Sequence, residues 1–214
     1  MADDAYQIRD ISFFGSPRRV LMQSANGPCP LLAVCNVLLL RNQLVLPKAK
    51  PTICFSELIQ MLSNLMLDLN ARERDEVRAA NIEQSMMSCI EILPTLNVGL
   101  DVNCRFSGPR DFEYTRELVV FDLLDISIVH GWLVSREDNE AFRIVGSLSY
   151  NVLAEQLVRC EEARQGAGGE ASGDEADQAK LLKEGALMRN FLDSSASQLT
   201  YEGLVDLHGA LKDR

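Results

Sequence analysis

The sequence predicts an α+β fold, because helical and strand periodicities occupy separate parts of the chain. Apolar residues within 55–69 recur at helical spacing and form one stripe, Leu58, Ile59, Leu62, Leu65 and Met66. From Gly99 to Phe106, apolar and polar residues alternate instead, which is typical of a half-buried strand. No internal repeat is indicated.

The same signals predict the other elements. Apolar and β-branched residues favour further strands at Arg19–Gln23, Leu118–Leu124 and Ile128–Val134. We expect helices at Leu31–Leu40, Phe55–Leu69, Ala71–Leu93, Tyr150–Cys160, Ala179–Leu192 and Leu199–Leu211. Pro94 ends the helix that begins at Ala71. Residues 161–178 are rich in glycine, alanine and acidic residues and contain no aromatic residue, which predicts a flexible surface loop.

Size and charge narrow the function classes. A chain of 214 residues that is 47% hydrophobic can bury the core of one domain spanning 1–214. Its net charge of −10 disfavours nucleic acid as a partner, because phosphate binding requires a basic face, and it suits a basic partner surface. The longest apolar run, Leu31–Leu40, is far shorter than the roughly 20 residues of a membrane span.

The cysteine pattern indicates reduced thiols. The six cysteines form no CxxC pair and no Cys/His metal spacing, and the N-terminus has no secretory hydrophobic segment. We therefore expect a monomeric protein of the cytoplasm, with the nucleus as a further location, and no metal site.

The most informative segment is Gln23-Ser24-Ala25-Asn26-Gly27-Pro28-Cys29-Pro30, which runs into the apolar helix. Asn-Gly-Pro favours a turn and Pro30 suits the first helical position, so the helix starts at Cys29. The free N–H groups and the dipole of a helix N-terminus favour thiolate over thiol. Gln23 can donate its side-chain amide to a developing oxyanion, a contact that contributes about 3 kcal/mol in acyl transfer. This is the arrangement of a papain-like cysteine protease.

Alternatives stay open on the residues alone. Cys29 is also explained as a small apolar residue at a helix start, and Gln23 as a surface strand residue. Of the two histidines, His130 lies in a predicted strand, where Cys–His enzymes usually carry their base, but a hydrogen-bonded core histidine explains it as well. His208, near a helix end, is better explained as a C-terminal helix cation.

A family resemblance extends from the cysteine segment along most of the chain. Residues 23–32 (QSANGPCPLL), followed by Asn36-Val37-Leu38-Leu39-Leu40, closely resemble the signature of the MINDY family of cysteine deubiquitinases. The likeness covers about residues 6–207. Its other motifs are Gly99-Leu100-Asp101-Val102-Asn103, Arg105-Phe106, Phe112-Glu113-Tyr114-Thr115, Val120-Phe121-Asp122-Leu123-Leu124-Asp125-Ile126, His130-Gly131-Trp132-Leu133-Val134, Ser149-Tyr150-Asn151, Phe191-Leu192 and Gln198-Leu199-Thr200-Tyr201.

The resemblance implies a papain-like cysteine protease fold, with the nucleophile at a helix N-terminus packed on a small, mainly antiparallel sheet. It implies an enzyme that hydrolyses isopeptide bonds in K48-linked polyubiquitin (the number is ubiquitin's own), without a cofactor. By matching motif, Cys29 is the nucleophile and Gln23 the oxyanion-hole residue, in agreement with the physical argument.

The resemblance also assigns binding and regulatory residues. Val102, Trp132 and Tyr150 match positions that grip the ubiquitin donating its C-terminus, although Val102 and Trp132 are equally explained as core residues. Tyr6 and Asp101 match a pair able to restrain the loop before the cysteine until substrate opens it.

The catalytic base is where this sequence departs from the family pattern. In the family the base lies in a Phe-Phe-Arg-Asn-Asn-His-Phe strand after the Thr-Tyr-containing helix, and this sequence ends at Arg214 before such a strand. His130 is then expected to hold the strand that carries Trp132. We expect a partial MINDY domain that lacks its last strands, as in a truncated gene model. A genuine product of this length would be a pseudoenzyme or a ubiquitin binder.

Two other function classes remain. One is a ubiquitin-binding module without catalysis. The other is a papain-like enzyme acting on a different protein, because Gln and Cys alone do not fix the substrate.

Overall fold

The computed structural model of the chain describes residues 5–23, 29–48, 50–70, 76–97, 99–166 and 175–212. The chain divides into two compact units. Unit 1 comprises residues 1–101 and 115–127, and unit 2 comprises residues 102–114 and 128–214. Helices and a small antiparallel sheet occur together, so the predicted α+β class is confirmed.

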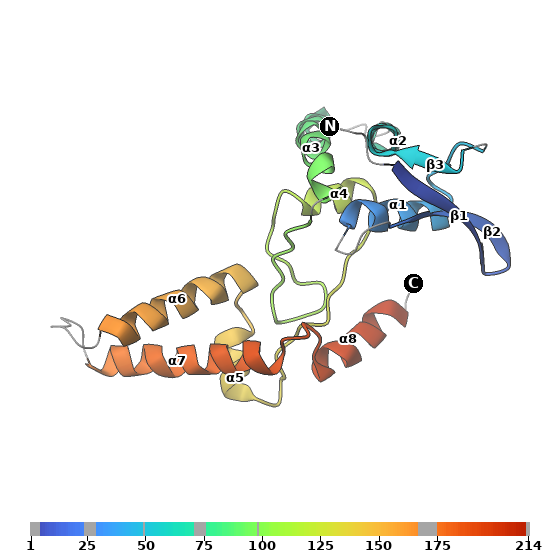
Figure 1. The fold of residues 1–214 in the computed structure, drawn as a ribbon. Helices are drawn as coiled ribbons and strands as arrows, with labels where there is room; N and C mark the ends of the chain where they lie inside the picture. The colour runs from blue at the N-terminus through green and yellow to red at the C-terminus, as the bar shows by residue number, and fades with distance from the viewer. Residues whose placement is uncertain are drawn as a thin grey trace. The chain divides into compact units, whose positions relative to one another are not determined.

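Unit 1 contains a three-stranded sheet in its described part, with strand order β2-β1-β3 (Figure 1). The strands are β1 (Ala5–Phe13), β2 (Ser16–Met22) and β3 (Thr52–Cys54), and both pairs are antiparallel. Phe14 and Gly15 close the β1–β2 hairpin with φ of 47° and 73°. A two-residue turn with two positive φ values matches the twist of the strands. The sequence predicted only β2, as Arg19–Gln23.

Helix α1 (Pro30–Leu40) packs against β2. The Asn36 side chain fixes this contact, because its Oδ1 accepts the Leu21 backbone N–H at 2.8 Å and its Nδ2 donates to the Leu21 carbonyl at 3.0 Å. The amide thus pairs with an edge strand as another strand would. The helix predicted at Leu31–Leu40 is confirmed, and Asn36 explains why a polar residue interrupts its apolar run.

The other helices of unit 1 surround a common core. They are α2 (Phe55–Asn70), α3 (Glu76–Ile92), the 3₁₀ helix η1 (Leu93–Asn97) and α4 (Leu118–Leu123). The predicted stripe of α2 is confirmed at Leu58, Leu62 and Met66, which are fully buried. The α-helix before Pro94 ends at Ile92, close to the predicted stop.

The predicted strand at Leu118–Leu124 is wrong, because these residues form α4. A short, continuous apolar run carries no periodicity that separates a buried strand from a buried helix. Burial of Val120, Leu123 and Leu124 follows helical spacing.

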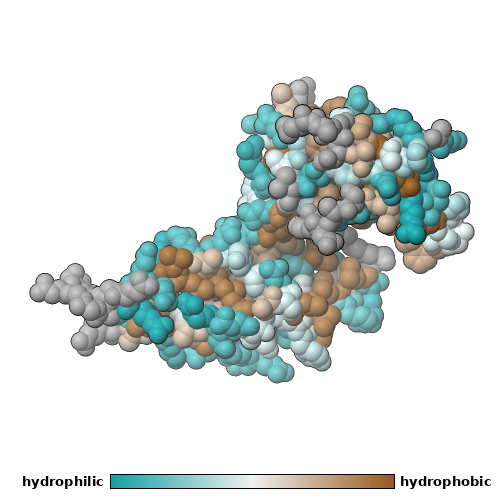
Figure 2. Space-filling view, viewed as in Figure 1, coloured by the Kyte–Doolittle hydropathy of each residue, from teal (hydrophilic) through white to brown (hydrophobic). Residues whose placement is uncertain are grey.

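Unit 2 consists of helices and extended loops in its described part. The helices are α5 (Asn139–Val145), α6 (Tyr150–Gly166), α7 (Glu175–Ser194) and α8 (Tyr201–Lys212). Helices α6 and α7 lie side by side (Figure 1). Gly185 allows their close approach, since a Cβ there would lie 2.8 Å from Cys160 Sγ. Figure 2 shows hydrophobic patches among the hydrophilic surface of this helix pair.

The flexible loop predicted at 161–178 is shorter than expected. Helix α6 continues to Gly166 and α7 already begins at Glu175. The remaining residues, 167–174, lie outside the described ones. Charged pairs contribute to the longer helices, among them Arg189 with Glu161 at 3.0 Å.

Two further predicted strands are replaced by irregular backbone. Of Gly99–Phe106, only Cys104 and Arg105 make isolated bridges, to Phe112 and Ser149. Asn103, expected on the polar face, is buried, and its Nδ2 donates to Glu113 at 2.7 Å. Sequence alternation does not reveal such a satisfied polar residue in the core.

The predicted strand Ile128–Val134 is extended but belongs to no ladder. Its backbone is bonded to loops, as in His130 N–H to the Pro109 carbonyl at 3.0 Å and Val134 N–H to the Phe106 carbonyl at 3.2 Å. Thr200 completes the pairing, since its hydroxyl donates to the Leu133 carbonyl at 2.8 Å. A single threonine thus takes the place of a neighbouring strand.

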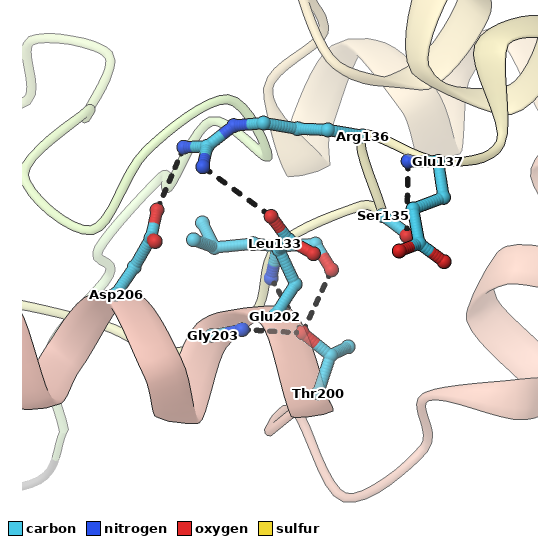
Figure 3. A network of polar contacts seen from close by, with 8 residues as sticks. All are labelled: Leu133, Ser135, Arg136, Glu137, Thr200, Glu202, Gly203 and Asp206. Carbon is cyan, nitrogen blue, oxygen red and sulfur yellow. Dashed lines mark hydrogen bonds and ion pairs between the residues drawn. The ribbon is translucent and has the colours of Figure 1, made fainter.

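Helix α8 is held against this extended segment by charge and by a glycine pair. Arg136 contacts Asp206 at 2.7 Å and Glu202 at 3.3 Å (Figure 3). Gly203 and Gly131 lie in such close contact that a Cβ on Gly203 would overlap the Gly131 carbonyl. Only glycine permits this approach.

His130 fixes the other side of the segment. Its Nδ1 accepts the Trp132 N–H at 3.3 Å, so its Nε2 carries the proton and donates to the Asp111 carbonyl at 3.2 Å. Burial lowers the pKa of His130, and the backbone hydrogen bond to Asp111 opposes this in part. The neutral ring therefore supports the segment that carries Trp132.

We expect Gly203→Ala to lower the free energy of unfolding by about 1–3 kcal/mol, because the new methyl group forces α8 away from Gly131. The matched control is Gly209→Ala in the same helix, where an added Cβ meets no atom within 4 Å. That control should be neutral or slightly stabilising, since alanine favours helix. Urea denaturation measures both, and equal stabilities of the two variants would contradict the packing argument.

The lowered pKa of His130 predicts a pH dependence of stability. Below about pH 6.5 the unfolded chain protonates this histidine while the folded chain does not, so the free energy of unfolding falls as the pH drops. His130→Gln should flatten this decline. Denaturation from about pH 7 to about pH 5 measures the slopes, and identical slopes in the two proteins would show that His130 does not titrate as described.

Candidate active site

Cys29 is the N-cap residue of α1. Its φ of −126° and ψ of 84° are non-helical, Pro30 occupies the first turn, and the Cys29 carbonyl accepts the Ala33 N–H at 3.2 Å. The helix therefore starts where the sequence predicted. The thiol is half-buried at the positive end of the helix dipole, a position that stabilises negative charge on sulfur.

A polar cluster of three residues surrounds the thiol in unit 1. The Tyr6 hydroxyl, from β1, donates to Asn97 Oδ1 at 2.6 Å. Cys29 Sγ lies 3.6 Å from the same oxygen. Tyr6 is buried, and Asn97 is the last residue of η1, which packs against α1. We call Tyr6, Asn97 and Cys29 the thiol cluster.

Sequence reasoning missed Asn97. It lies between an apolar helix and the glycine of a family motif, and nothing in its spacing connects it with Cys29. Only the fold brings the two residues together, across 68 positions of sequence. Tyr6 was expected near the cysteine loop, and its described hydrogen bond goes to Asn97.

Gln23 and Asp101 also belong to unit 1. Gln23 follows the end of β2, exposed, on the strand that packs against α1. Asp101 is exposed, and its carbonyl accepts the Thr115 hydroxyl at 3.3 Å. The segment 24–28 between Gln23 and Cys29 lies outside the described residues. The oxyanion-hole and restraint roles therefore stay predictions.

The cysteines fall into two classes. All six are free, and four of them are buried. Burial raises the pKa of Cys35 above the ordinary range, with a smaller contribution from Cys29, and burial raises the pKa of Cys89 to about 11. The pKa values of Cys104 and Cys160 are raised by the same cause. Only Cys29 and Cys54 are partly exposed, which makes Cys54 a natural reference for Cys29.

Both histidines belong to unit 2. His130 uses both ring nitrogens to hold the backbone, as described above, which leaves neither available as a base. His208 is exposed on α8. The structural role expected for His130 agrees with its contacts.

The three predicted ubiquitin contacts lie in unit 2. Trp132 is 6% exposed, lies in the core with Phe106 and Phe191, and donates its indole N–H to Ser195 at 2.7 Å. This matches the core alternative for Trp132. Tyr150 begins α6, is 41% exposed and has its ring 5.5 Å from that of Trp132. Val102 is half-buried.

A cavity of about 430 Å³ also lies in unit 2. It is lined by the 133–138 segment, by α5 and α7 and by the start of α8, and none of the predicted site residues lines it. Within the described residues, no helix is both long and apolar enough to cross a membrane.

Comparisons with known proteins identify the family. The family model described as MINDY deubiquitinase matches residues 4–214. The Homo sapiens protein named ubiquitin carboxyl-terminal hydrolase MINDY-1 is 40% identical over 210 residues, which are 98% of this chain and 42% of that protein. The Homo sapiens protein named ubiquitin carboxyl-terminal hydrolase MINDY-2 is 39% identical over 208 residues, 97% of this chain and 31% of that protein. This chain thus spans less than half the length of these curated relatives. With nearly its whole length matched, the chain belongs to the MINDY deubiquitinase family.

Proposed function

We propose that this chain carries the nucleophile of a cysteine deubiquitinase that hydrolyses isopeptide bonds in K48-linked polyubiquitin. The observation that carries the proposal is the position of Cys29, a half-buried thiol at the N-cap of α1 in a chain of this family. The similar proteins named as ubiquitin carboxyl-terminal hydrolases support ubiquitin as the substrate. The chain's charge of −10 suits a basic partner.

The proposed reaction is acyl transfer to sulfur. The Cys29 thiolate attacks the isopeptide carbonyl, and the oxygen of the tetrahedral intermediate accepts hydrogen bonds from the Gln23 amide and a backbone N–H. Collapse of the intermediate breaks the C–N bond, and the lysine amine leaves with a proton. Water then hydrolyses the thioester and regenerates the thiol. The resemblance places the proton-transferring histidine in a family strand that this sequence does not include.

Ubiquitin is proposed to contact unit 2 through Tyr150 and Val102. Tyr150 presents an exposed ring beside the buried Trp132, so Trp132 supports this ring from the core. An aromatic side chain held by its neighbours loses little entropy on binding, which is typical of an interface anchor. Tyr6 and Asp101 remain proposed as the pair that restrains the cysteine loop.

The first test is labelling with ubiquitin that carries a C-terminal electrophile. We expect a covalent adduct with the chain, and no adduct with Cys29→Ala. Gln23→Ala should slow adduct formation at least about tenfold, because it removes an oxyanion donor. The matched control is Cys54→Ala, which removes the other partly exposed cysteine, also next to a helix N-terminus, and should label normally.

The other outcomes separate the alternative functions. Reversible binding of ubiquitin without capture would contradict catalysis by Cys29 and indicate a binding module. Absence of both capture and binding would contradict ubiquitin as the substrate. Unchanged labelling of Cys29→Ala would exclude Cys29 as the nucleophile.

A second test addresses the binding surface. Tyr150→Ala should weaken binding of K48-linked diubiquitin at least about fivefold, the usual effect of removing an aromatic anchor. Tyr114→Ala is the control, because Tyr114 also belongs to unit 2 and is 74% exposed. Fluorescence titration with labelled diubiquitin measures both affinities, and an equal effect of the two substitutions would argue against Tyr150 as a specific contact.

A further inference from the structure

The hydrogen bonds of the thiol cluster determine which protonation state of Cys29 they favour. Asn97 Oδ1 is an amide oxygen, which only accepts hydrogen bonds. It receives the Tyr6 hydroxyl proton at 2.6 Å and faces Cys29 Sγ at 3.6 Å, within reach of a sulfur donor. A thiol has a proton to donate to this oxygen, whereas a thiolate has none and meets its lone pairs.

Tyr6 determines how the Asn97 amide is oriented. The Tyr6 side chain is buried, and β1 pairs Tyr6 with Ile53 of β3, so its hydroxyl has little freedom to move. A hydroxyl proton directed at Oδ1 keeps that oxygen next to the sulfur. If the amide turned by about 180°, its NH₂ group would face the sulfur instead and would stabilise the thiolate.

We propose that Asn97 is a positioning residue that holds Cys29 in the thiol form, and that Tyr6 keeps Asn97 in the orientation that does so. The resting site therefore opposes the helix dipole, which favours thiolate at the same sulfur. Rotation or withdrawal of the Asn97 amide activates the nucleophile. The relevance of this device to catalysis rests on the proposed function, but the device itself is a property of the sulfur and is measurable without ubiquitin.

The test is the pH profile of Cys29 alkylation by iodoacetamide in the complete 214-residue chain. Peptide mapping by mass spectrometry follows Cys29 and Cys54 in the same sample, so Cys54 serves as the internal reference. The plateau rate at high pH reports access of the reagent to the sulfur. The pH of half-maximal rate reports the balance between thiol and thiolate.

Two replacements of Asn97 are expected to act in opposite directions. Asn97→Ala removes the acceptor and admits water, so the midpoint should fall and alkylation near neutral pH should accelerate about three- to tenfold, the effect of one hydrogen bond. Asn97→Asp keeps the shape and places a negative charge beside the sulfur, so the midpoint should rise and alkylation should slow by a similar factor.

Tyr6→Phe completes the set, because it removes only the hydroxyl that orients the amide. Its midpoint should fall, by no more than that of Asn97→Ala. The midpoint of Cys54 should stay the same in all three variants, and circular dichroism confirms that each is folded.

The sign of the Asn97 effects decides the proposal. A purely structural role of Asn97 would change the plateau rate in both variants and leave their midpoints together. Midpoints that do not move, or that move in the same direction for alanine and aspartate, would overturn the proposal. Failure of ubiquitin labelling with these shifts intact would instead contradict only the proposed function.

Discussion

The structure of unit 1 depends on where α1 begins and on how this helix is fixed to the sheet. Pro30 sets the first turn, and the Asn36 amide pairs with both backbone groups of Leu21 in β2. These constraints determine the position of Cys29, because the residue before the first helical turn has no freedom to join the helix. The free thiol at this point meets the helix dipole on one side and the Asn97 oxygen on another. Two opposing influences on one sulfur make its reactivity adjustable by a small movement of a neighbouring side chain.

Unit 2 solves a different problem, which is how to bury an extended segment without strand partners. Backbone groups of 128–134 are bonded to loop carbonyls, to the ring of His130 and to the hydroxyl of Thr200. The Gly131–Gly203 contact brings α8 close enough for the Thr200 bonds to form. Trp132 anchors the same segment in the core, with its indole N–H satisfied by Ser195. Its buried position leaves the neighbouring Tyr150 as the exposed ring of the pair.

Sequence periodicity predicted the helices well, because the buried stripe of α2 and the start of α1 are local properties. It failed where burial is arranged by distant residues. The run Leu118–Leu124 is apolar throughout and carries no period, so its helical form was not recoverable. The strand predicted at 128–134 has the right extension, but its partners are a threonine and loop carbonyls. Strands β1 and β3 were missed, since β1 mixes charged and apolar residues and β3 has three residues.

The candidate site divides in the same way. Cys29 and its helix start follow from turn and helix signals, and Gln23 follows from its spacing, whereas Asn97 reaches the thiol only through the packing of η1 against α1. The central claim is that Cys29 is the nucleophile for the ubiquitin C-terminus. The most direct measurement is peptide mapping of the adduct between this chain and a ubiquitin electrophile. The account predicts the modification on the peptide that contains Cys29. Modification confined to Cys54, or to another residue of the chain, would contradict it.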